Sequence, residues 1–201
     1  MMNVQMSLEA TAKQKIEKQI GAIVLYVMYA GICELHKIDR RVREEIDSWP
    51  DGMTYCLACS ADGPKLYFRK NKDKLQRLNP RIQRYYDTCI TFRSLEAAFM
   101  VLTGRQGIAQ AYAAHAFTLH GDVGTAMELT RCVDVVESYL FPQVMTKRIL
   151  KEVAQKNCSA LALYMRMLIG AARGAYTMSP EEKKPYRIKC MHKKYEETDH
   201  I

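Results

Sequence analysis

The sequence predicts an α/β (α+β) fold in which a sheet and helices form one domain, with extra N- and C-terminal helices along the chain. Two observations support this prediction. Between residues 50 and 120, short stretches alternate apolar and polar residues, as strands with one buried face do, and helical stretches lie between some of them. Before and after this region, longer stretches carry apolar residues at the spacing of an amphipathic helix.

Composition is that of a soluble globular protein. The 201 residues are 48% hydrophobic and 26% charged, which is enough for one good core plus additions. The seven cysteines are odd in number and irregularly spaced, so we expect no disulfide framework and a reducing, cytoplasmic location. The N-terminal residues lack the pattern of a secretory signal peptide, and none is expected.

The first fifty residues are expected to be helical. Ser7 is the expected N-cap of a long first helix, and Asp39 that of a second helix, which ends before Pro50. A turn over residues 49–52 then separates this helical segment, residues 1–49, from the strands.

One part of the first helix is strongly apolar. Residues 20–33 are fourteen residues without a charge, whereas a membrane-spanning helix needs about 20 such residues. We therefore expect a buried core helix or a dimer helix. Interfacial contact with a membrane and a membrane-spanning helix are the less favoured alternatives. The apolar positions expected on its buried face are Ile16, Ile20, Ile23, Val27 and Ala30.

Strands are expected after the turn. Residues Met53–Cys59 alternate, which places Tyr55, Leu57 and Cys59 on one face. A hairpin-type turn follows, and Lys65–Arg69 is expected to pair back with the first strand.

The next segment, residues 71–86, fits either a third strand or a basic insertion. The net charge of +8 is concentrated in residues 70–84 and after Arg166. Such a stretch beside Tyr85 and Tyr86 can be a solvated surface, a contact for single-stranded nucleic acid, or a contact for anionic lipid head groups. Its basic residues are Lys70, Lys72, Lys74, Arg77, Arg81 and Arg84.

The segment from Asp87 to Asp122 has a distinctive order of elements. A strand follows Asp87, a helix begins at Ser94 and stops at Gly104, a second short helix follows, and another strand ends at Gly121. The three acids Asp87, Glu96 and Asp122 lie at element boundaries, where caps and helix-dipole effects explain them.

This order resembles the sterol-carrier-protein lipid-binding family. The family pattern is a strand opening on Asp, a helix closing on Leu-Thr-Gly, a small-residue helix, and a strand closing on Gly-Asp before an amphipathic helix. The match is close over the 36 residues from Asp87 to Asp122 and looser over about 90 residues. The resemblance implies a mixed, largely antiparallel sheet covered by helices. The family usually needs only a short strand and turn in the place of residues 71–86, so this chain departs from its pattern there.

Helices are expected to follow Asp122. One runs to Leu140, a second covers residues 143–153, and a third covers 158–173 with Leu161, Met165, Leu168 and Ala172 on one face. After Tyr176 we expect an exposed charged tail. The predicted organisation is a helical segment, a lipid-binding domain, C-terminal helices and a tail, over residues 1–49, 50–141, 142–176 and 177–201.

Residues with catalytic or metal-binding potential do not form a site in the sequence. Cys56 and Cys59 lie on a strand, so their side chains point to opposite faces of the sheet. His115 and His120 flank another strand and also face opposite sides, so neither pair can easily share a metal ion. The sequence has neither a nucleophile elbow nor a phosphate-binding glycine loop. We therefore expect a protein that is not an enzyme, with no metal and no cofactor.

The apolar residues of the central region fit either a packed core or, by the resemblance, the lining of a hydrophobic cavity for a fatty acid, acyl chain or sterol-like lipid. The high methionine content suits both readings. The resemblance implies the following ligand-binding set: Ile90, Phe92, Leu95, Phe99, Leu102, Tyr112, Phe117, Leu119, Met127, Val133, Val136 and Leu140.

The function expected from the resemblance is binding, with transfer as a further hypothesis, of a hydrophobic ligand without catalysis. The alternatives are a scaffold or oligomerisation module with a filled cavity, and an accessory protein to a lipid-related enzyme. The expected partner is a lipid or another hydrophobic small molecule. A homodimer and transient contact with an anionic membrane surface are further hypotheses, and nucleic acid is disfavoured.

Overall fold

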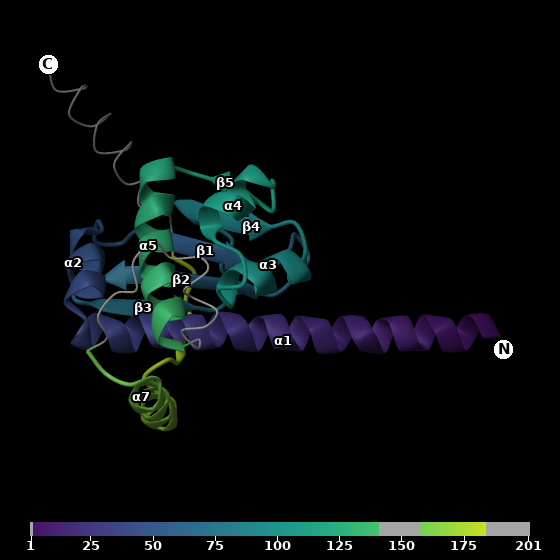
Figure 1. The fold of residues 1–201 in the computed structure, drawn as a ribbon, viewed down its shortest axis with the longest axis horizontal. Helices are drawn as coiled ribbons and strands as arrows, with labels where there is room; N and C mark the ends of the chain where they lie inside the picture. Colours follow the sequence, from purple (N-terminus) through teal and green to yellow (C-terminus); the bar gives the residue numbers. More distant parts are fainter. Residues whose placement is uncertain (1, 141–156, 184–201) are drawn as a thin grey trace, which may run out of the picture.

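A computed structural model describes residues 2–140 and 157–183, so the helix expected over 143–153 and the tail beyond 183 lie outside the described residues. The strands form one six-stranded sheet in the order β5-β4-β1-β2-β3-β6 (Figure 1). Its strands are β1 Thr54–Ala58, β2 Lys65–Asn71, β3 Lys74–Leu78, β4 Thr88–Phe92, β5 Phe117–His120 and β6 Met178–Ser179.

The sheet is mixed and largely antiparallel, which confirms the predicted fold class. Pairs β1–β2, β2–β3 and β4–β5 are antiparallel, while β1–β4 and β3–β6 are parallel. The third strand does lie inside the basic stretch, because Lys74–Leu78 pairs with β2 through the tight turn at Lys72, whose φ is 53°.

Helices α1 and α5 pack on one face of the sheet (Figure 1). Helix α1 is long and carries the first part of the chain beyond the body of the domain, and α7 lies on the far side of α1 from the sheet. The helices are α1 Met2–Ile38, α2 Arg40–Ser48, α3 Leu95–Leu102, α4 Ile108–Ala113, α5 Val123–Leu140 and α7 Ala160–Ala172.

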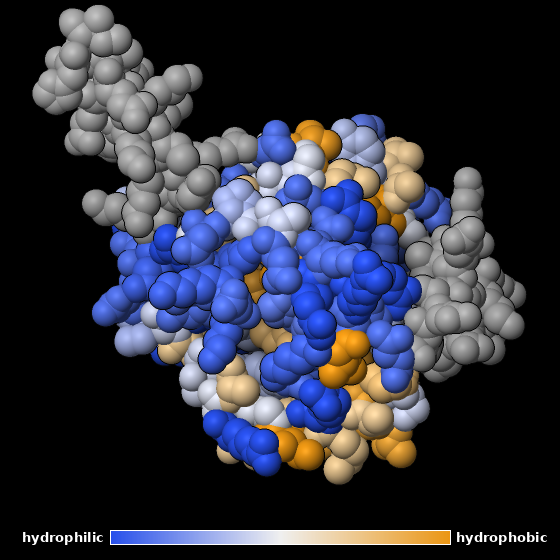
Figure 2. Space-filling model, turned by 90° about the vertical axis from the view of Figure 1, so that its left-hand side faces the viewer, coloured by the Kyte–Doolittle hydropathy of each residue, from blue (hydrophilic) through white to orange (hydrophobic). Residues whose placement is uncertain are grey.

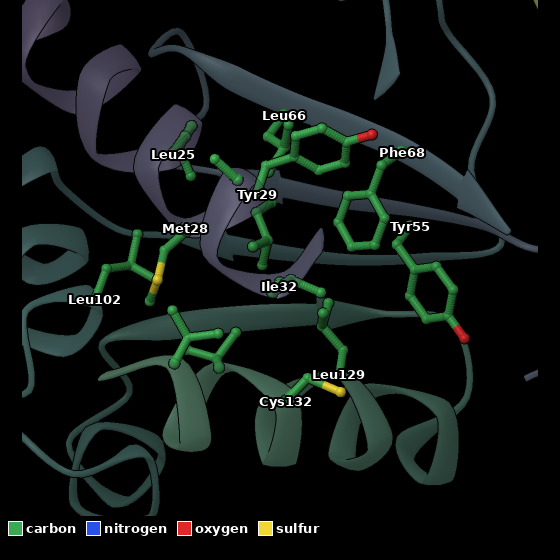
Figure 3. Packing of buried hydrophobic residues seen from close by; sticks show 14 of the residues in the cluster. Leu25, Met28, Tyr29, Ile32, Tyr55, Leu66, Phe68, Leu102, Leu129 and Cys132 are labelled. Atoms are coloured by element: carbon green, nitrogen blue, oxygen red, sulfur yellow. The ribbon is translucent and has the colours of Figure 1, made fainter. Parts of the chain in front are cut away.

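The main core lies between α1, the sheet and α5. Figure 3 shows Ile32 of α1 between Phe68 of β2 and Leu129 of α5, while Met28 of α1 lies beside Leu102 of α3. Tyr55, Leu57 and Cys59 all belong to this core, as the alternation of β1 predicts. The core therefore includes side chains from the N-terminal helix, so this helix and the sheet fold as one body.

The opposite face of the sheet carries a smaller cluster. Cys56 and Cys89 are neighbours across the parallel pair β1–β4, and both are buried there with Tyr67 and Leu78. Tyr86, in the loop before β4, packs against them. The second half of the segment 71–86 is thus a loop that helps to cover this face.

Helix α1 differs from the prediction in two ways. It begins at Met2, so Ser7 lies within the helix and is not its N-cap. Ile16, Ile20 and Ile23 are 56%, 45% and 60% exposed, although Gly21 between them is buried against Leu95 and Cys59, because the helix meets the domain here with another side. The fully buried core side chains of α1 begin at Leu25.

The same helix is the one candidate for a membrane span among the described residues. Residues 14–38 are long and apolar enough by length and composition, with 39% of the most apolar window buried. Because Met28, Ile32 and Leu35 are at most 1% exposed in the core, the buried half is a structural part of the domain.

Asp39 is the N-cap of α2, as predicted. Its carboxylate accepts a hydrogen bond from the Arg41 backbone N–H at 2.9 Å. The face of the molecule that carries α2 is mostly hydrophilic (Figure 2), and the exposed Arg40–Glu44 ion pair at 2.6 Å lies on this helix. Helix α2 thus differs from α1 and α7, which carry large exposed apolar side chains.

Helix α7 packs with a different face from the one predicted. Leu163, Met167 and Gly170 are buried, whereas Leu161 and Leu168 are 72% and 64% exposed. Nearly every position of this helix is apolar, so periodicity alone does not distinguish its buried face. The chain then turns at Gly174, with φ of 70°, and forms β6 beside β3, which the sequence did not predict.

Candidate functional site

A pocket of about 510 Å³ lies between α4, the strands β4 and β5, and the first half of α5. Its walls are mostly apolar. Ile90, Phe117 and Leu119 line it from the sheet, Tyr112 lines it from α4, and Met127 lines it from α5. Other apolar lining residues are Ile108, Ala109, Val123 and Ala126.

The pocket follows from the local sequence. In β5 the side chains alternate, so Phe117 and Leu119 turn inward while Thr118 and His120 are exposed. Helix α4 has only six residues and is fixed to the domain by the fully buried Ala111. A helix this short leaves part of the sheet face uncovered, and Tyr112 stays 65% exposed at the edge of the gap.

Aromatic contacts hold one wall of the pocket. The Phe117 ring lies between the rings of Tyr112 and Phe92, with a centroid separation of 5.8 Å in each pair. The pair with Phe92 is edge-to-face, an arrangement that aromatic rings prefer. Phe117 is therefore fixed by its neighbours, while Leu119 borders open space in the pocket.

The polar end of the pocket is on α5. Thr130, Arg131 and Asp134 line it there, and the Thr130 hydroxyl donates a hydrogen bond to the Met127 carbonyl at 2.9 Å. The guanidinium of Arg131 is held by Glu45 of α2, with Nε and Nη2 donating to the two carboxylate oxygens at 2.8 and 2.6 Å.

Two carboxyl groups on α5 are in unusual surroundings. Burial raises the pKa of Asp134 to about 6. Glu137, which is 5% exposed, lies one turn further along the helix, and burial together with the nearby Asp134 raises its pKa to about 9. Among the described residues, no group hydrogen-bonds the Oε1 atom of Glu137. The α5 face that begins at the apolar Met127 therefore ends in acids that are poorly solvated.

A second pocket of about 550 Å³ lies where α1 meets α3. Val24, Leu95, Phe99 and Leu102 give it apolar walls, and Gly21 allows the close approach of α3, since a Cβ there would collide with Leu95. The acids Glu17 and Glu96 also line it.

A small internal cavity of about 20 Å³ lies between these two pockets, with room for little more than a water molecule. It shares Ile90 and Phe117 with the first pocket and Leu102 with the second. The two pockets are thus separated by a thin layer of core side chains.

The residues predicted to bind ligand fall into four groups. The pocket at α4 and β5 is lined by Ile90, Tyr112, Phe117, Leu119 and Met127. The pocket at α1 is lined by Leu95, Phe99 and Leu102, and the internal cavity adds Phe92 and Val133. Val136 and Leu140 lie in the core instead, close to Gly31 of α1. A binding role for any of them stays a prediction.

Sequence reasoning missed the polar end of the first pocket. Thr130, Arg131 and Asp134 follow Met127 at helical spacing, and this spacing was the available signal. The pairing of Arg131 with Glu45 had no such signal, because the two residues are 86 positions apart.

The basic stretch does not form one continuous patch. The Lys70 ammonium is buried and donates to the carbonyls of Asp47 and Trp49 at 2.6 and 2.8 Å. The Arg77 guanidinium lies over the Tyr26 ring, 5.1 Å from its centroid. Lys72, Lys74, Arg81 and Arg84 are exposed, so these four remain available for an anionic surface.

The thiols and other potential metal ligands of the described residues do not form a site. Within residues 2–140 and 157–183, no group of three or more His, Cys, Asp or Glu side chains is placed to hold a metal ion. Cys56 and Cys59 belong to clusters on opposite faces of the sheet, as the alternation predicts. Burial raises the pKa of Cys59 to about 12, which keeps this thiol protonated.

No protein-family model matches the chain, and no curated protein matches it. Similar solved structures include the apo form of sterol carrier protein 2 from Yarrowia lipolytica, with 14% identity, a TM-score of 0.40, and 59% of this chain and 92% of that chain covered. Sterol carrier protein domain 2 of Helicoverpa armigera has 19% identity and a TM-score of 0.35, with coverages of 53% and 82%. The ubiquinone synthesis protein UbiJ-SCP2 has 11% identity and a TM-score of 0.39, with coverages of 62% and 98%. These structures are of the type that residues 87–122 resemble in sequence.

Proposed function

We propose that this protein binds a hydrophobic ligand, without catalysis, in the pocket between α4, β5 and α5. The observation that carries the proposal is the pocket itself: about 510 Å³ with walls that are mostly apolar. Pockets for small hydrophobic ligands usually measure about 300 to 1,000 Å³. The resemblance of residues 87–122 to a lipid-binding family points to the same class of ligand.

Binding of an alkyl or ring system needs no special motif. Each methylene removed from water contributes about 0.8 kcal/mol, so a long chain gains several kcal/mol before the cost of association. The ligand that we propose is a fatty acid, another acyl chain or a sterol-like lipid. Transfer of this ligand between membranes, in the cytoplasm, is the wider role that we propose, with the exposed Lys72, Lys74, Arg81 and Arg84 contacting anionic head groups.

Mass spectrometry of the purified protein tests the proposal. The native protein is measured first, and again after incubation with a mixed lipid extract and after organic extraction. A stoichiometric lipid adduct that organic solvent removes is the expected result. A clean apo mass under all conditions, from a protein that is folded by circular dichroism, would refute the proposal.

A second candidate function is self-association through α1. Ile16, Ile20 and Ile23 form an exposed apolar stripe that leads directly to the pocket at α3. Exposed lysines at positions 15 and 18 accompany the stripe, while Glu17 and Glu96 line the pocket, so a second copy offers complementary charge. We propose that two copies pair in this way, each stripe lying in the pocket of the other.

Sedimentation equilibrium distinguishes the second candidate. Ile20→Glu is expected to shift the protein from dimer to monomer, whereas Gln19→Glu, which adds the same charge at the next exposed position, is expected to leave the dimer intact. A monomeric wild-type protein would remove this candidate without affecting the ligand-binding proposal.

A further inference from the structure

We infer that the pocket between α4, β5 and α5 prefers amphiphiles whose polar end donates a hydrogen bond, a hydroxyl or an amine, over free fatty-acid carboxylates. The inference rests on the proposed function, because it names the ligand class for the same pocket. It follows from the charges that the structure places at the α5 side of this pocket.

Among the residues that line this pocket, the charged side chains are Arg131 and Asp134. A fatty acid needs a cation or several N–H donors to hold its carboxylate in partly dry surroundings. Arg131 is the cation in reach, so its partners decide whether the pocket can accept such a ligand.

Arg131 already has a carboxylate partner. Glu45 accepts hydrogen bonds from its Nε and Nη2 atoms at 2.8 and 2.6 Å, in the two-pronged geometry that suits a guanidinium. The Glu45 side chain is 19% exposed, so part of its hydration has been replaced by this pairing. A ligand carboxylate would have to displace Glu45 and leave it without a partner.

Asp134 offers the opposite chemistry. In the described part of the chain, its carboxyl group forms no hydrogen bond or ion pair, although burial raises its pKa. A hydroxyl or ammonium group at the polar end of a ligand can donate to this carboxyl group, whereas a ligand carboxylate would face a like charge.

Glu137 strengthens the same bias. It lies three residues beyond Asp134, on the side of α5 that also carries Met127 and Thr130, and its Oε1 atom has no partner among the described residues. Because burial raises its pKa to about 9, Glu137 is protonated at neutral pH and adds no negative charge, but its Oε1 atom remains an acceptor at this end of α5. The pocket thus combines apolar walls with an end that accepts hydrogen bonds.

Competition binding with three ligands that share one alkyl tail tests the inference. Hexadecanol, hexadecylamine and palmitate each displace a pyrene-labelled decanol from the purified full chain at neutral pH. The alcohol and the amine are expected to compete at concentrations about tenfold below that of palmitate. Palmitate that binds as tightly as hexadecanol would overturn the inference.

Two variants identify the residues responsible. Glu45→Gln frees Arg131 and is expected to improve palmitate binding about tenfold, while Glu44→Gln, which breaks the Arg40 pair on the same helix, leaves it unchanged. Asp134→Asn, which removes the negative charge, is expected to reduce the advantage of the amine over palmitate. Unchanged palmitate binding in a folded Glu45→Gln protein would also contradict the inference.

The outcomes separate the two proposals. If neither the labelled decanol nor any of the three ligands binds to the folded wild-type protein, the proposed function itself fails. If they bind without preference, the proposed function stands and this inference is wrong. The order of the three ligands on the wild-type protein decides the inference even where a variant does not fold.

Discussion

Gly121 lies directly against the backbone carbonyl of Asp87, with no space between them for a side chain. A Cβ at position 121 would also lie 2.9 Å from the Cα of Thr88, and the backbone of Gly121 has a φ of 109°. On its other side, Asp87 binds β1: its Oδ2 atom accepts a hydrogen bond from the Thr54 N–H at 2.9 Å. The two ends of the segment that resembles sterol carrier proteins therefore meet at one junction, beside the start of β1 and β4.

Gly121→Ala is expected to destabilise the protein severely. The new methyl group would press on the backbone of β4, and the positive φ is unfavourable for alanine, so we expect a loss of about 3 kcal/mol or more in the free energy of unfolding. Gly174→Ala is the matched control, because Gly174 also has a positive φ but a Cβ there would make only an ordinary contact, at 3.6 Å from Thr177 Cγ2. This control is expected to lose only about 1 kcal/mol. Urea unfolding measures both, and equal losses would contradict the role of the close approach.

Leu119→Trp is expected to abolish uptake of a fluorescent fatty alcohol while the fold survives. Leu119 borders the pocket and is only partly buried, so the larger ring can fill the pocket without entering the core. Leu168→Trp, on the exposed face of α7, is the control and is expected to bind normally. A titration followed by fluorescence measures the uptake. Normal uptake by a folded Leu119→Trp protein would show that the pocket is not the binding site.

Asp39→Ala is expected to destabilise the corner between α1 and α2 by about 2 to 3 kcal/mol. The variant removes the cap of α2 and the acceptor for the Tyr139 hydroxyl, which lies 2.8 Å from Asp39 Oδ2. Asp62→Ala, in the exposed turn between β1 and β2, is the control and is expected to change stability little. Equal thermal midpoints for the two variants would contradict this prediction.

Acid should weaken the same corner. Burial alone would raise the pKa of Asp39, but hydrogen bonds from Arg41 and Tyr139 outweigh it and hold this pKa below its ordinary value. A carboxyl group with a lowered pKa stabilises the folded state above its unfolded pKa of about 4, and this contribution is lost as the pH falls further. Below this pH, the free energy of unfolding is expected to fall more steeply with decreasing pH for the wild type than for Asp39→Asn. An equal pH dependence for the two proteins would contradict a lowered pKa at Asp39.

The acids of α5 give the opposite pH dependence. The pKa values of Asp134 and Glu137 are raised to about 6 and about 9, so the folded protein keeps protons that the unfolded chain releases above about pH 4. The free energy of unfolding should therefore fall as the pH rises from about 4 to 9, by up to about 1.4 kcal/mol per pH unit for each titrating proton. Glu137→Gln is expected to flatten this dependence most between pH 6 and 9. Identical slopes for the variant and the wild type would show that Glu137 does not titrate in this way.

The sequence predicted the structure well where side chains alternate or where a cap residue marks a boundary. The alternation of Tyr55, Leu57 and Cys59 gave the correct face of β1, and Asp39 marked the start of α2. Periodicity failed on α1 and α7 for one reason: it shows which residues share a side of a helix, but not which side meets the rest of the chain. Ile16 and Ile20 are thus exposed although they continue the stripe that is buried further on.

The site was predictable only in part. Apolar positions such as Phe117 and Leu119 could be identified from the strand pattern, because alternation fixes their direction. Whether such residues fill a core or border a pocket depends on how much of the sheet α4 covers. The local sequence of the strands does not determine this coverage. The Arg131–Glu45 pair joins two helices that are distant in sequence, so it required the tertiary structure.

The two-residue strand β6 has a consequence for how this protein can be shortened. Met178 and Ser179 pair with Arg77 and Leu78 of β3, the last strand of the hairpin series, and so occupy its outer edge. A chain that stops before Met178 would present unpaired backbone N–H and C=O groups along this edge, a template for edge-to-edge aggregation. Solubility on truncation should therefore depend on a few residues near the C-terminus, far along the chain from the pocket.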